Sequence, residues 1–190
     1  MITPSFLDQT LFNELAEKAA GNPRGRQHHN LHQMEEPCHR MVVGLQPGTY
    51  VPPHRHLSSD KAETLLVLKG KLGVLIFDQD GQLLDKRVLV AGGECLGVDL
   101  PPGVFHGLVV LEADSLMFEC KAGPYRPVGE GELAHWAPRE GDSGVAEYHR
   151  WMCAQFDCSL PVVAVASGEP LESGATNRGL RQRRQRVFSG

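Results

Sequence analysis

The sequence has no apolar run that approaches the length of a membrane span, and Leu72–Phe77 is the longest apolar stretch outside the shorter expected strands. A helix that crosses a bilayer needs about 20 consecutive apolar residues, so we expect no transmembrane segment. The first residues, Met1-Ile2-Thr3-Pro4, lack a positive region followed by an apolar one. We therefore expect no signal peptide and a cytoplasmic location.

Cysteine is scarce, and a large excess of charge of one sign is missing. Five cysteines, at positions 38, 95, 120, 153 and 158, form an odd and scattered set that favours reduced thiols over a disulfide framework. The chain has 19 Lys and Arg against 23 Asp and Glu, and the net charge of −4 argues against a protein built for nucleic acid. A basic tail runs from Arg178 to Arg186, and it either stays solvated or touches nucleic acid or anionic lipid.

Glycine and proline are abundant, with 21 and 13 residues, and they divide the middle of the chain into short apolar runs. Turn compositions such as Gln46-Pro47-Gly48 separate the runs, because Gly tolerates positive φ and Pro presets φ. About eight closely spaced strands without intervening helices predict an all-β antiparallel sandwich or barrel. The expected strands are Met41–Leu45, Thr49–Pro53, Thr64–Leu68, Leu72–Phe77, Gln82–Val90, Glu94–Leu100, Val104–Leu111 and Leu116–Cys120.

The regions on either side of the expected barrel have a different pattern. Thr10 is the expected cap of a short helix over Leu11–Ala20. A second helix is expected over Val145–Phe156, with one further strand over Leu160–Ala166. We therefore divide the chain into an N-terminal helix and polar segment (1–36), a barrel (37–123), a C-terminal helical and irregular extension that packs on it (124–166), and a disordered basic tail (167–190).

Three histidines and one glutamate occur in patterns that suit a metal site. His54 and His56 form a His-x-His pair, whose rings share one face of an extended strand because side chains alternate with period two. Glu63 precedes the next strand, and Pro101-Pro102-Gly103 sets a turn that aims His106 from a neighbouring strand. Three imidazoles and a carboxylate suit one divalent transition metal: Zn, Fe, Mn, Ni or Co. The alternative is that these are ordinary polar residues near a barrel mouth.

These patterns resemble the two cupin motifs. Gly48-x5-His54-x-His56-x6-Glu63-x6-Gly70 resembles the first motif, and Pro101-x-Gly103-x2-His106 resembles the second. Four further segments are similar to the WbuC-type cupin-fold metalloprotein family: Leu66-x-Leu68-x-Gly70, Phe77-x-x-Asp80-Gly81, Gly123-Pro124-Tyr125 and Trp136-Ala137-Pro138. The likeness covers roughly residues 10–140 and implies a double-stranded β-helix, the cupin jelly-roll barrel, with one metal and a homodimer.

Several more residues are candidates for a place beside the metal. The spacing from His56 to Glu63 is longer than in the broadest cupin pattern, which makes Glu63 the least secure of the four ligands.

Tyr50, Lys61 and Tyr125 lie close in sequence to the ligands or to the family-like segments, and they are the candidate catalytic residues. A half-buried tyrosine or a solvated lysine is the plainer interpretation of each.

Substrate-binding candidates come from the polar segment before the barrel and from its first strand. The Arg40 guanidinium can hold a phosphate or carboxylate with two parallel hydrogen bonds. Asn30 and His32 belong to a segment expected to cross the barrel mouth, although an exposed polar loop is the alternative. His149-x3-Cys153-x4-Cys158 offers three ligands where a closed zinc site needs four, so we expect these cysteines to be core residues.

Different classes of function fit this set of residues. The first is a metal-dependent enzyme on a small polar substrate such as a sugar or nucleotide sugar, acting as an isomerase or epimerase, or as a dioxygenase if the metal is Fe(II). The sugar suggestion comes from the family resemblance. The second is a non-catalytic cupin that binds a small ligand, and the third is a metal that only stabilises the barrel.

Overall fold

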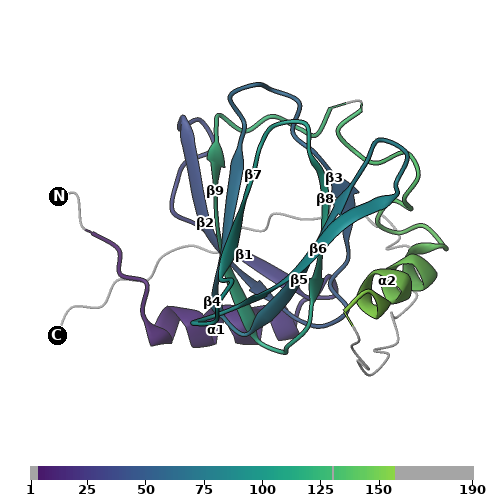
Figure 1. Ribbon diagram of the computed structural model, residues 1–190. Helices are drawn as coiled ribbons and strands as arrows, with labels where there is room; N and C mark the ends of the chain where they lie inside the picture. The colour runs from purple at the N-terminus through teal and green to yellow at the C-terminus, as the bar shows by residue number, and fades with distance from the viewer. Residues whose placement is uncertain (1–3, 130, 157–190) are drawn as a thin grey trace, which may run out of the picture.

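Two antiparallel sheets face each other and form a barrel, as Figure 1 shows for the computed structural model, which describes residues 4–129 and 131–156. One sheet has the strand order β1-β2-β9-β4-β7, and the other has the order β3-β8-β5-β6. This topology confirms the expected all-β class and double-stranded β-helix. The elements are α1 Gln9–Ala20, β1 Arg26–Asn30, β2 Cys38–Leu45, β3 Val51–His54, β4 Glu63–Lys69, β5 Lys71–Phe77, β6 Leu83–Val90, β7 Gly97–Leu100, β8 Phe105–Val110, β9 Ser115–Ala122 and α2 Val145–Ala154.

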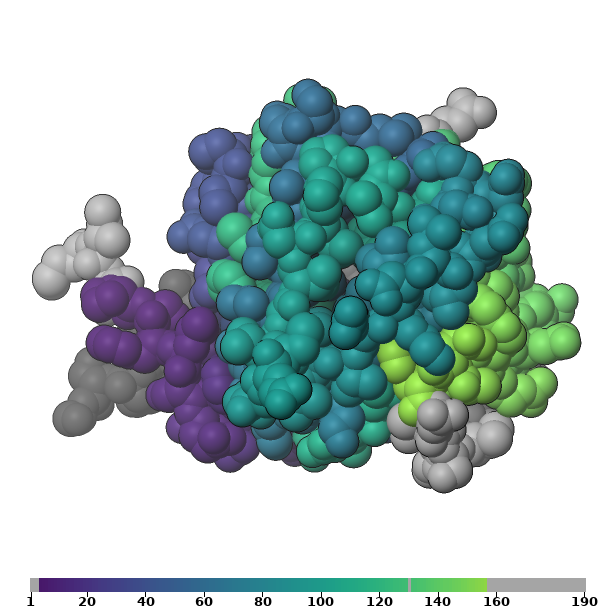
Figure 2. All heavy atoms as spheres, viewed as in Figure 1, coloured from purple at the N-terminus to yellow at the C-terminus, as the bar shows by residue number. Residues whose placement is uncertain are grey.

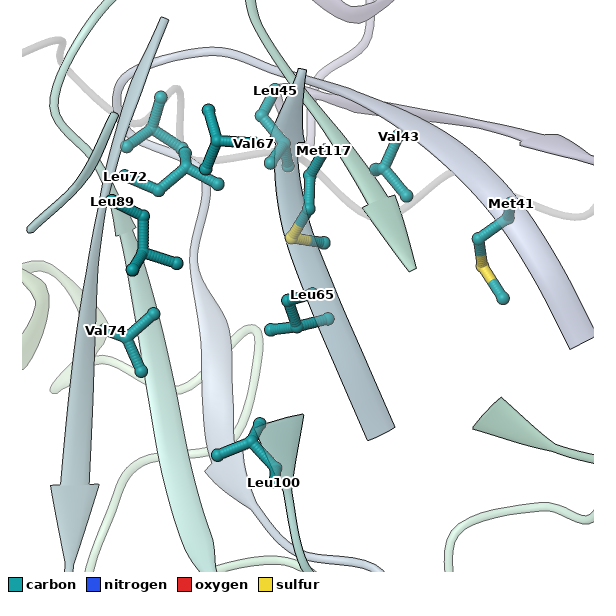
Figure 3. Packing of buried hydrophobic residues seen from close by; sticks show 11 residues of the cluster. Met41, Val43, Leu45, Leu65, Val67, Leu72, Val74, Leu89, Leu100 and Met117 are labelled. Carbon is teal, nitrogen blue, oxygen red and sulfur yellow. The ribbon is translucent and has the colours of Figure 1, made fainter. Parts of the chain in front are cut away.

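The core of the barrel lies between the two sheets (Figure 3). Strand β4 shows how the sequence builds it, because Leu65 and Val67 are buried while their neighbours along the strand are more exposed. Strand β5 reads as one continuous apolar run because both of its faces are covered. Leu72 packs in the barrel core, whereas Leu75 packs in a second core beneath α2.

The two helices cover opposite faces of the barrel (Figures 1 and 2). Helix α1 packs on the five-stranded sheet, and α2 packs on the four-stranded sheet. The expected cap of α1 is wrong: the Asp8 carboxylate, not Thr10, accepts a hydrogen bond from the backbone N–H of Leu11 at 3.0 Å. Neither helix within the described residues has the length and apolar character to cross a bilayer.

Helix α1 approaches the sheet closely because β2 has a glycine beneath it. A Cβ atom at Gly44 would lie 2.6 Å from the backbone oxygen of Leu15, and a backbone atom of a helix cannot give way as a flexible side chain can. We therefore expect Gly44→Ala to destabilise the protein by about 1–3 kcal/mol through displacement of α1. Urea unfolding measures the change.

Gly21→Ala is the matched control for this prediction. A Cβ atom at Gly21 meets its nearest neighbour, the backbone oxygen of Glu17, at an ordinary 3.7 Å. A Gly44→Ala protein with the unfolding midpoint of the control would show that α1 does not depend on this close approach.

The polar segment before the expected barrel contains a strand that the sequence did not indicate. Arg26–Asn30 forms β1, which pairs antiparallel with β2 from Arg26 opposite Leu45 to Asn30 opposite Met41. Its run of polar side chains carries no apolar alternation, so backbone pairing decides its structure. The sheet therefore begins inside the segment that we had separated as 1–36. The predicted strand Leu160–Ala166, Cys158 and the basic tail lie outside the described residues.

Candidate metal centre

Three strands of the barrel bring the predicted metal ligands together. His54 ends β3 and lies opposite His106 of β8 in the strand register, while Glu63 begins β4 on the facing sheet. Potential ligand atoms of His54, Glu63 and His106 all lie within 4.8 Å of one another. His56 follows β3, and its Nε2 atom lies 3.4 Å from Glu63 Oε2. His54, Glu63 and His106 thus form one compact cluster from segments far apart in the sequence, and His56 approaches it through its contact with Glu63.

Backbone carbonyls orient two of the imidazole rings. His54 Nδ1 lies 3.1 Å from the Pro52 carbonyl oxygen, and His106 Nδ1 lies 3.0 Å from the Val104 carbonyl oxygen. A carbonyl only accepts, so each Nδ1 carries the proton and, in the neutral ring, each Nε2 presents a lone pair. His106 Nε2 lies 3.2 Å from Glu63 Oε2. A neutral ring therefore has no proton to offer Glu63 Oε2, whereas a protonated ring would donate to it.

Two buried atoms of this cluster have no hydrogen-bond partner among the described residues: His56 Nε2 and Glu63 Oε2. Leaving a buried acceptor unpaired costs roughly 1–3 kcal/mol, and more for a charged group. A divalent cation among the four side chains would satisfy both atoms at once. The donor set of imidazole nitrogens and one carboxylate oxygen suits Zn, Fe, Mn, Ni or Co.

The titration behaviour of the site favours the forms that bind a metal. Burial, reinforced by the neighbouring His106, lowers the pKa of His54 to about 3, so its ring is neutral at physiological pH. Burial alone would raise the pKa of Glu63, but hydrogen bonds with the imidazoles of His106 and His56 and the charge of the Lys121 ammonium outweigh it. The net shift of the Glu63 pKa is downward, and the carboxyl is ionised.

Two residues of β9 complete the site, and sequence reasoning missed them. Lys121 Nζ donates to Glu63 Oε1 at 3.1 Å, and it also pairs with the Glu119 carboxylate. Burial raises the pKa of Glu119 to about 7 despite the opposing charge of Lys121. The signal was present in the sequence, because Met117, Glu119 and Lys121 alternate along one strand and share its inner face. Lys121 thus binds Oε1 of Glu63, and Oε2 of the same carboxylate faces the histidines.

The cluster opens onto a cavity of about 360 Å³ between the sheets. Much of its wall is apolar, and the polar part comes from β1, from the loop after it, and from the metal cluster and its β9 neighbours. The cavity is lined by Arg26, His28, Asn30, His32, Met34, His39, Met41, Val43, Leu45, Val51, His54, Glu63, Leu65, His106, Gly107, Leu108, Met117, Glu119, Lys121 and Tyr125. A small molecule in this cavity would contact His54, His106 and Glu63 directly, because these three residues line it.

Three of the weaker candidates line this cavity: Asn30, His32 and Tyr125. The His32 ring is held in place, because it stacks on His39 with ring centroids 4.0 Å apart. Its Nδ1 atom lies 2.8 Å from the carbonyl oxygen and 3.0 Å from the backbone nitrogen of Arg40. These residues lie where a substrate would contact them.

The other weak candidates do not line the cavity. The Tyr50 hydroxyl donates to the carbonyl oxygen of Pro138 at 2.6 Å, and its ring is buried in the second core. Arg40 pairs with Glu36 at 2.8 Å, and its neighbour His39 points into the cavity instead, because successive side chains of a strand point to opposite faces. Lys61 lies in the loop before β4. Sequence proximity to the ligands is thus no guide to which side of a strand a residue occupies.

The second potential metal site is only partly described. Cys153 Sγ lies 3.7 Å from His149 Nε2, and both residues lie near Tyr50 in the second core. Within residues 4–129 and 131–156, the one cluster of three or more potential ligands is the set of His54, Glu63 and His106. Cys153 is buried in that core, as expected.

A family model described as a domain of unknown function (DUF6016) matches residues 7–89. The sequence matches none of the curated proteins.

Three solved structures illustrate the structural matches. KdgF from Halomonas sp. is 25% identical over 53% of this chain and 80% of its own, with a TM-score of 0.42. An oxalate oxidase in complex with glycolate is 23% identical over 67% of both chains, with a TM-score of 0.46. A cupin domain of Cnp3 from Schizosaccharomyces pombe is 13% identical over 51% of this chain and 60% of its own, with a TM-score of 0.38. The narrower resemblance to the WbuC-type family stays a prediction.

Proposed function

We propose that the protein is a metal-dependent cupin enzyme that acts on a small polar molecule bound in the cavity between its two sheets. One observation carries the proposal: His106 Nε2 and the buried Oε2 of Glu63 lie 3.2 Å apart, and a neutral His106 ring offers that oxygen no proton. A cation removes this conflict. An ordinary polar cluster would instead pair a donor with each acceptor.

The residues that would hold the ion are His54, His56, Glu63 and His106. When bound, the ion would polarise a carbonyl or hydroxyl oxygen of the substrate. Lys121 supports this arrangement by holding Glu63 Oε1, which fixes the carboxylate plane and leaves one oxygen for the ion. The carbonyls of Pro52 and Val104 keep the rings of His54 and His106 in the tautomer that binds a metal.

The size and lining of the cavity narrow the class of substrate. A cavity of 360 Å³ is near the lower end of the range of about 300–1,000 Å³ for small-molecule sites. It suits a monosaccharide-sized molecule better than a whole nucleotide sugar. Asn30 and His32 supply polar groups, whereas Met41 and Val43 supply an apolar wall. We therefore propose a small substrate with both a polar and an apolar side.

A cavity-filling variant tests whether turnover depends on this cavity. The protein is first loaded with each of the five candidate metals and assayed against a panel of monosaccharides and sugar acids. Met41→Trp adds a large ring to the cavity wall, so we expect turnover to fall at least about tenfold while metal content stays near one ion per chain. Leu84→Trp is the control, because Leu84 is 66% exposed on β6. Equal turnover by both variants would place the reaction outside the cavity.

A non-catalytic ligand-binding cupin is the second candidate, and the apolar part of the cavity lining favours it. In that case a panel compound would raise the melting temperature of the metal-loaded protein and be recovered unchanged. A dioxygenase would instead consume oxygen only when loaded with Fe(II). The homodimer and cytoplasmic location remain proposals from the sequence, and analytical ultracentrifugation tests the dimer.

A further inference from the structure

The outer face of the β2–β9 strand pair carries two thiols in contact. Cys38 Sγ and Cys120 Sγ lie 3.8 Å apart, although the two residues are 82 positions apart in the sequence. Arg40 is the residue directly opposite Cys120 in the register, and Cys38 is two positions before it. The cysteines are therefore diagonal neighbours on the same face of the sheet.

Both thiols are on the side of the sheet that faces away from the metal centre. His39 of β2 and Glu119 and Lys121 of β9 line the cavity, so the residues between and beside them point outward. Cys38 is exposed and Cys120 is partly exposed. An oxidant in solution can therefore reach the pair without entering the cavity.

We propose that Cys38 and Cys120 form a redox-modification site, at which a peroxide converts the two thiols to an intramolecular disulfide between β2 and β9. The sulfur atoms must approach from 3.8 Å to about 2.05 Å, the length of a disulfide bond. Cys38 can supply this movement, because it is the first residue of β2 and follows the loop at Pro37.

The chemistry balances in two steps. The Cys38 thiolate, at the exposed position, attacks one peroxide oxygen; an S–O bond forms, the O–O bond breaks, and hydroxide leaves to become water. Cys120 then loses its proton and attacks the Cys38 sulfur; an S–S bond forms, the S–O bond breaks, and a second water leaves. Two thiols and one hydrogen peroxide thus give one disulfide and two water molecules.

The environment of Cys120 fits the role of the second thiol. Burial raises the pKa of the Cys120 thiol, and the neighbouring Cys38 thiol raises it further, while the charge of Arg40 opposes them. Cys120 therefore stays protonated and meets less oxidant than Cys38 does. The guanidinium of Arg40 stabilises the thiolate at the moment when Cys120 attacks.

The disulfide would link two strands that form a wall of the cavity. It would close a loop spanning 82 positions, and constraint of the unfolded chain by a long loop stabilises the folded state. We expect the melting temperature of the oxidised protein to exceed that of the reduced protein by about 5 °C or more.

Intact mass of the full chain after treatment with hydrogen peroxide tests the proposal. We expect a loss of two hydrogen atoms per chain and a cross-linked peptide that contains Cys38 and Cys120. Cys38→Ser and Cys120→Ser should each lose both the cross-link and the rise in melting temperature. Cys95→Ser is the matched control and should keep both, because Cys95 Sγ contacts the Gly97 carbonyl oxygen instead of another sulfur.

Three outcomes would overturn the proposal. One is oxidation of Cys38 to a sulfinic acid without a cross-link. Another is a disulfide-linked dimer through Cys38 in place of the intramolecular bond. The third is a cross-link of Cys38 or Cys120 to Cys95, Cys153 or Cys158 in place of the bond between them. Because the thiols face away from the metal centre, none of these results depends on the proposed enzyme activity.

Discussion

Replacing both His54 and His106 with alanine should reduce the metal content of natively purified protein from about one ion per chain to background. Two of the three imidazoles disappear, and the remaining pair of His56 and Glu63 offers fewer ligands than a stable transition-metal site uses. Elemental analysis of the purified variant and of the unaltered protein measures the loss. The same measurement identifies the metal, and iron would favour oxygen chemistry whereas zinc would favour a Lewis-acid role.

His29→Ala is the matched control for the double variant. His29 lies on β1 between His28 and Asn30, which both line the cavity, but it does not line the cavity itself. It should therefore keep the full metal content. Circular dichroism spectra of all three proteins should coincide, since neither set of changes removes an apolar core residue. Full retention of metal by the double variant would show that the ion binds elsewhere in the chain.

Replacing Lys121 with methionine should destabilise the metal-free protein by about 3–5 kcal/mol. Its ammonium pairs with Glu63 and Glu119, and the side chains of Lys121, Glu63 and Glu119 are only 20%, 4% and 11% exposed. Methionine fills much of the same volume without the charge. Two buried carboxylates then remain without a cation, and removing one partner of a buried ion pair is costly for that reason. Urea unfolding in excess chelator measures the change.

Two further variants separate the charge effect from packing. Lys69→Met removes an exposed lysine of β4 and should change stability by less than about 0.5 kcal/mol. Glu119→Gln combined with Lys121→Met should be more stable than Lys121→Met alone, because one of the two unpaired carboxylates is gone. Bound metal should also reduce the cost of Lys121→Met, since the ion compensates Glu63. If Lys121→Met were as mild as Lys69→Met, water would be reaching these carboxylates.

Most strands were predictable because their signals are local. Leu65 and Val67 alternate with less buried residues, and turns such as Gln46-Pro47-Gly48 interrupt the chain through the φ preferences of Gly and Pro. The bounds of β4 and β5 each differ by one residue from the prediction at the N-terminal end. Strand β1 was missed because its five residues are all polar, and only pairing with β2 makes it a strand.

The residues of the candidate site likewise fall into those that the sequence indicated and those that only the structure revealed. His54, His56, Glu63 and His106 were identifiable because their spacing on strands and turns is a property of neighbouring residues. The pairing of Lys121 with Glu63 joins residues 58 positions apart, and it depends on β9 lying beside β4 in the sheet. Arg40 is the opposite case. Its place in the sequence suggested that it binds a substrate in the cavity, but side-chain alternation along β2 points it to the other face of the sheet.

The sequence by itself therefore determined most of the strands, the turns and the identity of the four residues that suit a metal, since each depends on backbone preferences and side-chain alternation over a few residues. Only the tertiary structure decided which polar groups share the cavity with them. It placed Glu119 and Lys121 beside Glu63, removed Tyr50 from the site, and brought Cys38 against Cys120 on the outer face. These are contacts between strands whose order in the sheet is set by packing of the whole barrel, which no short stretch of the chain encodes.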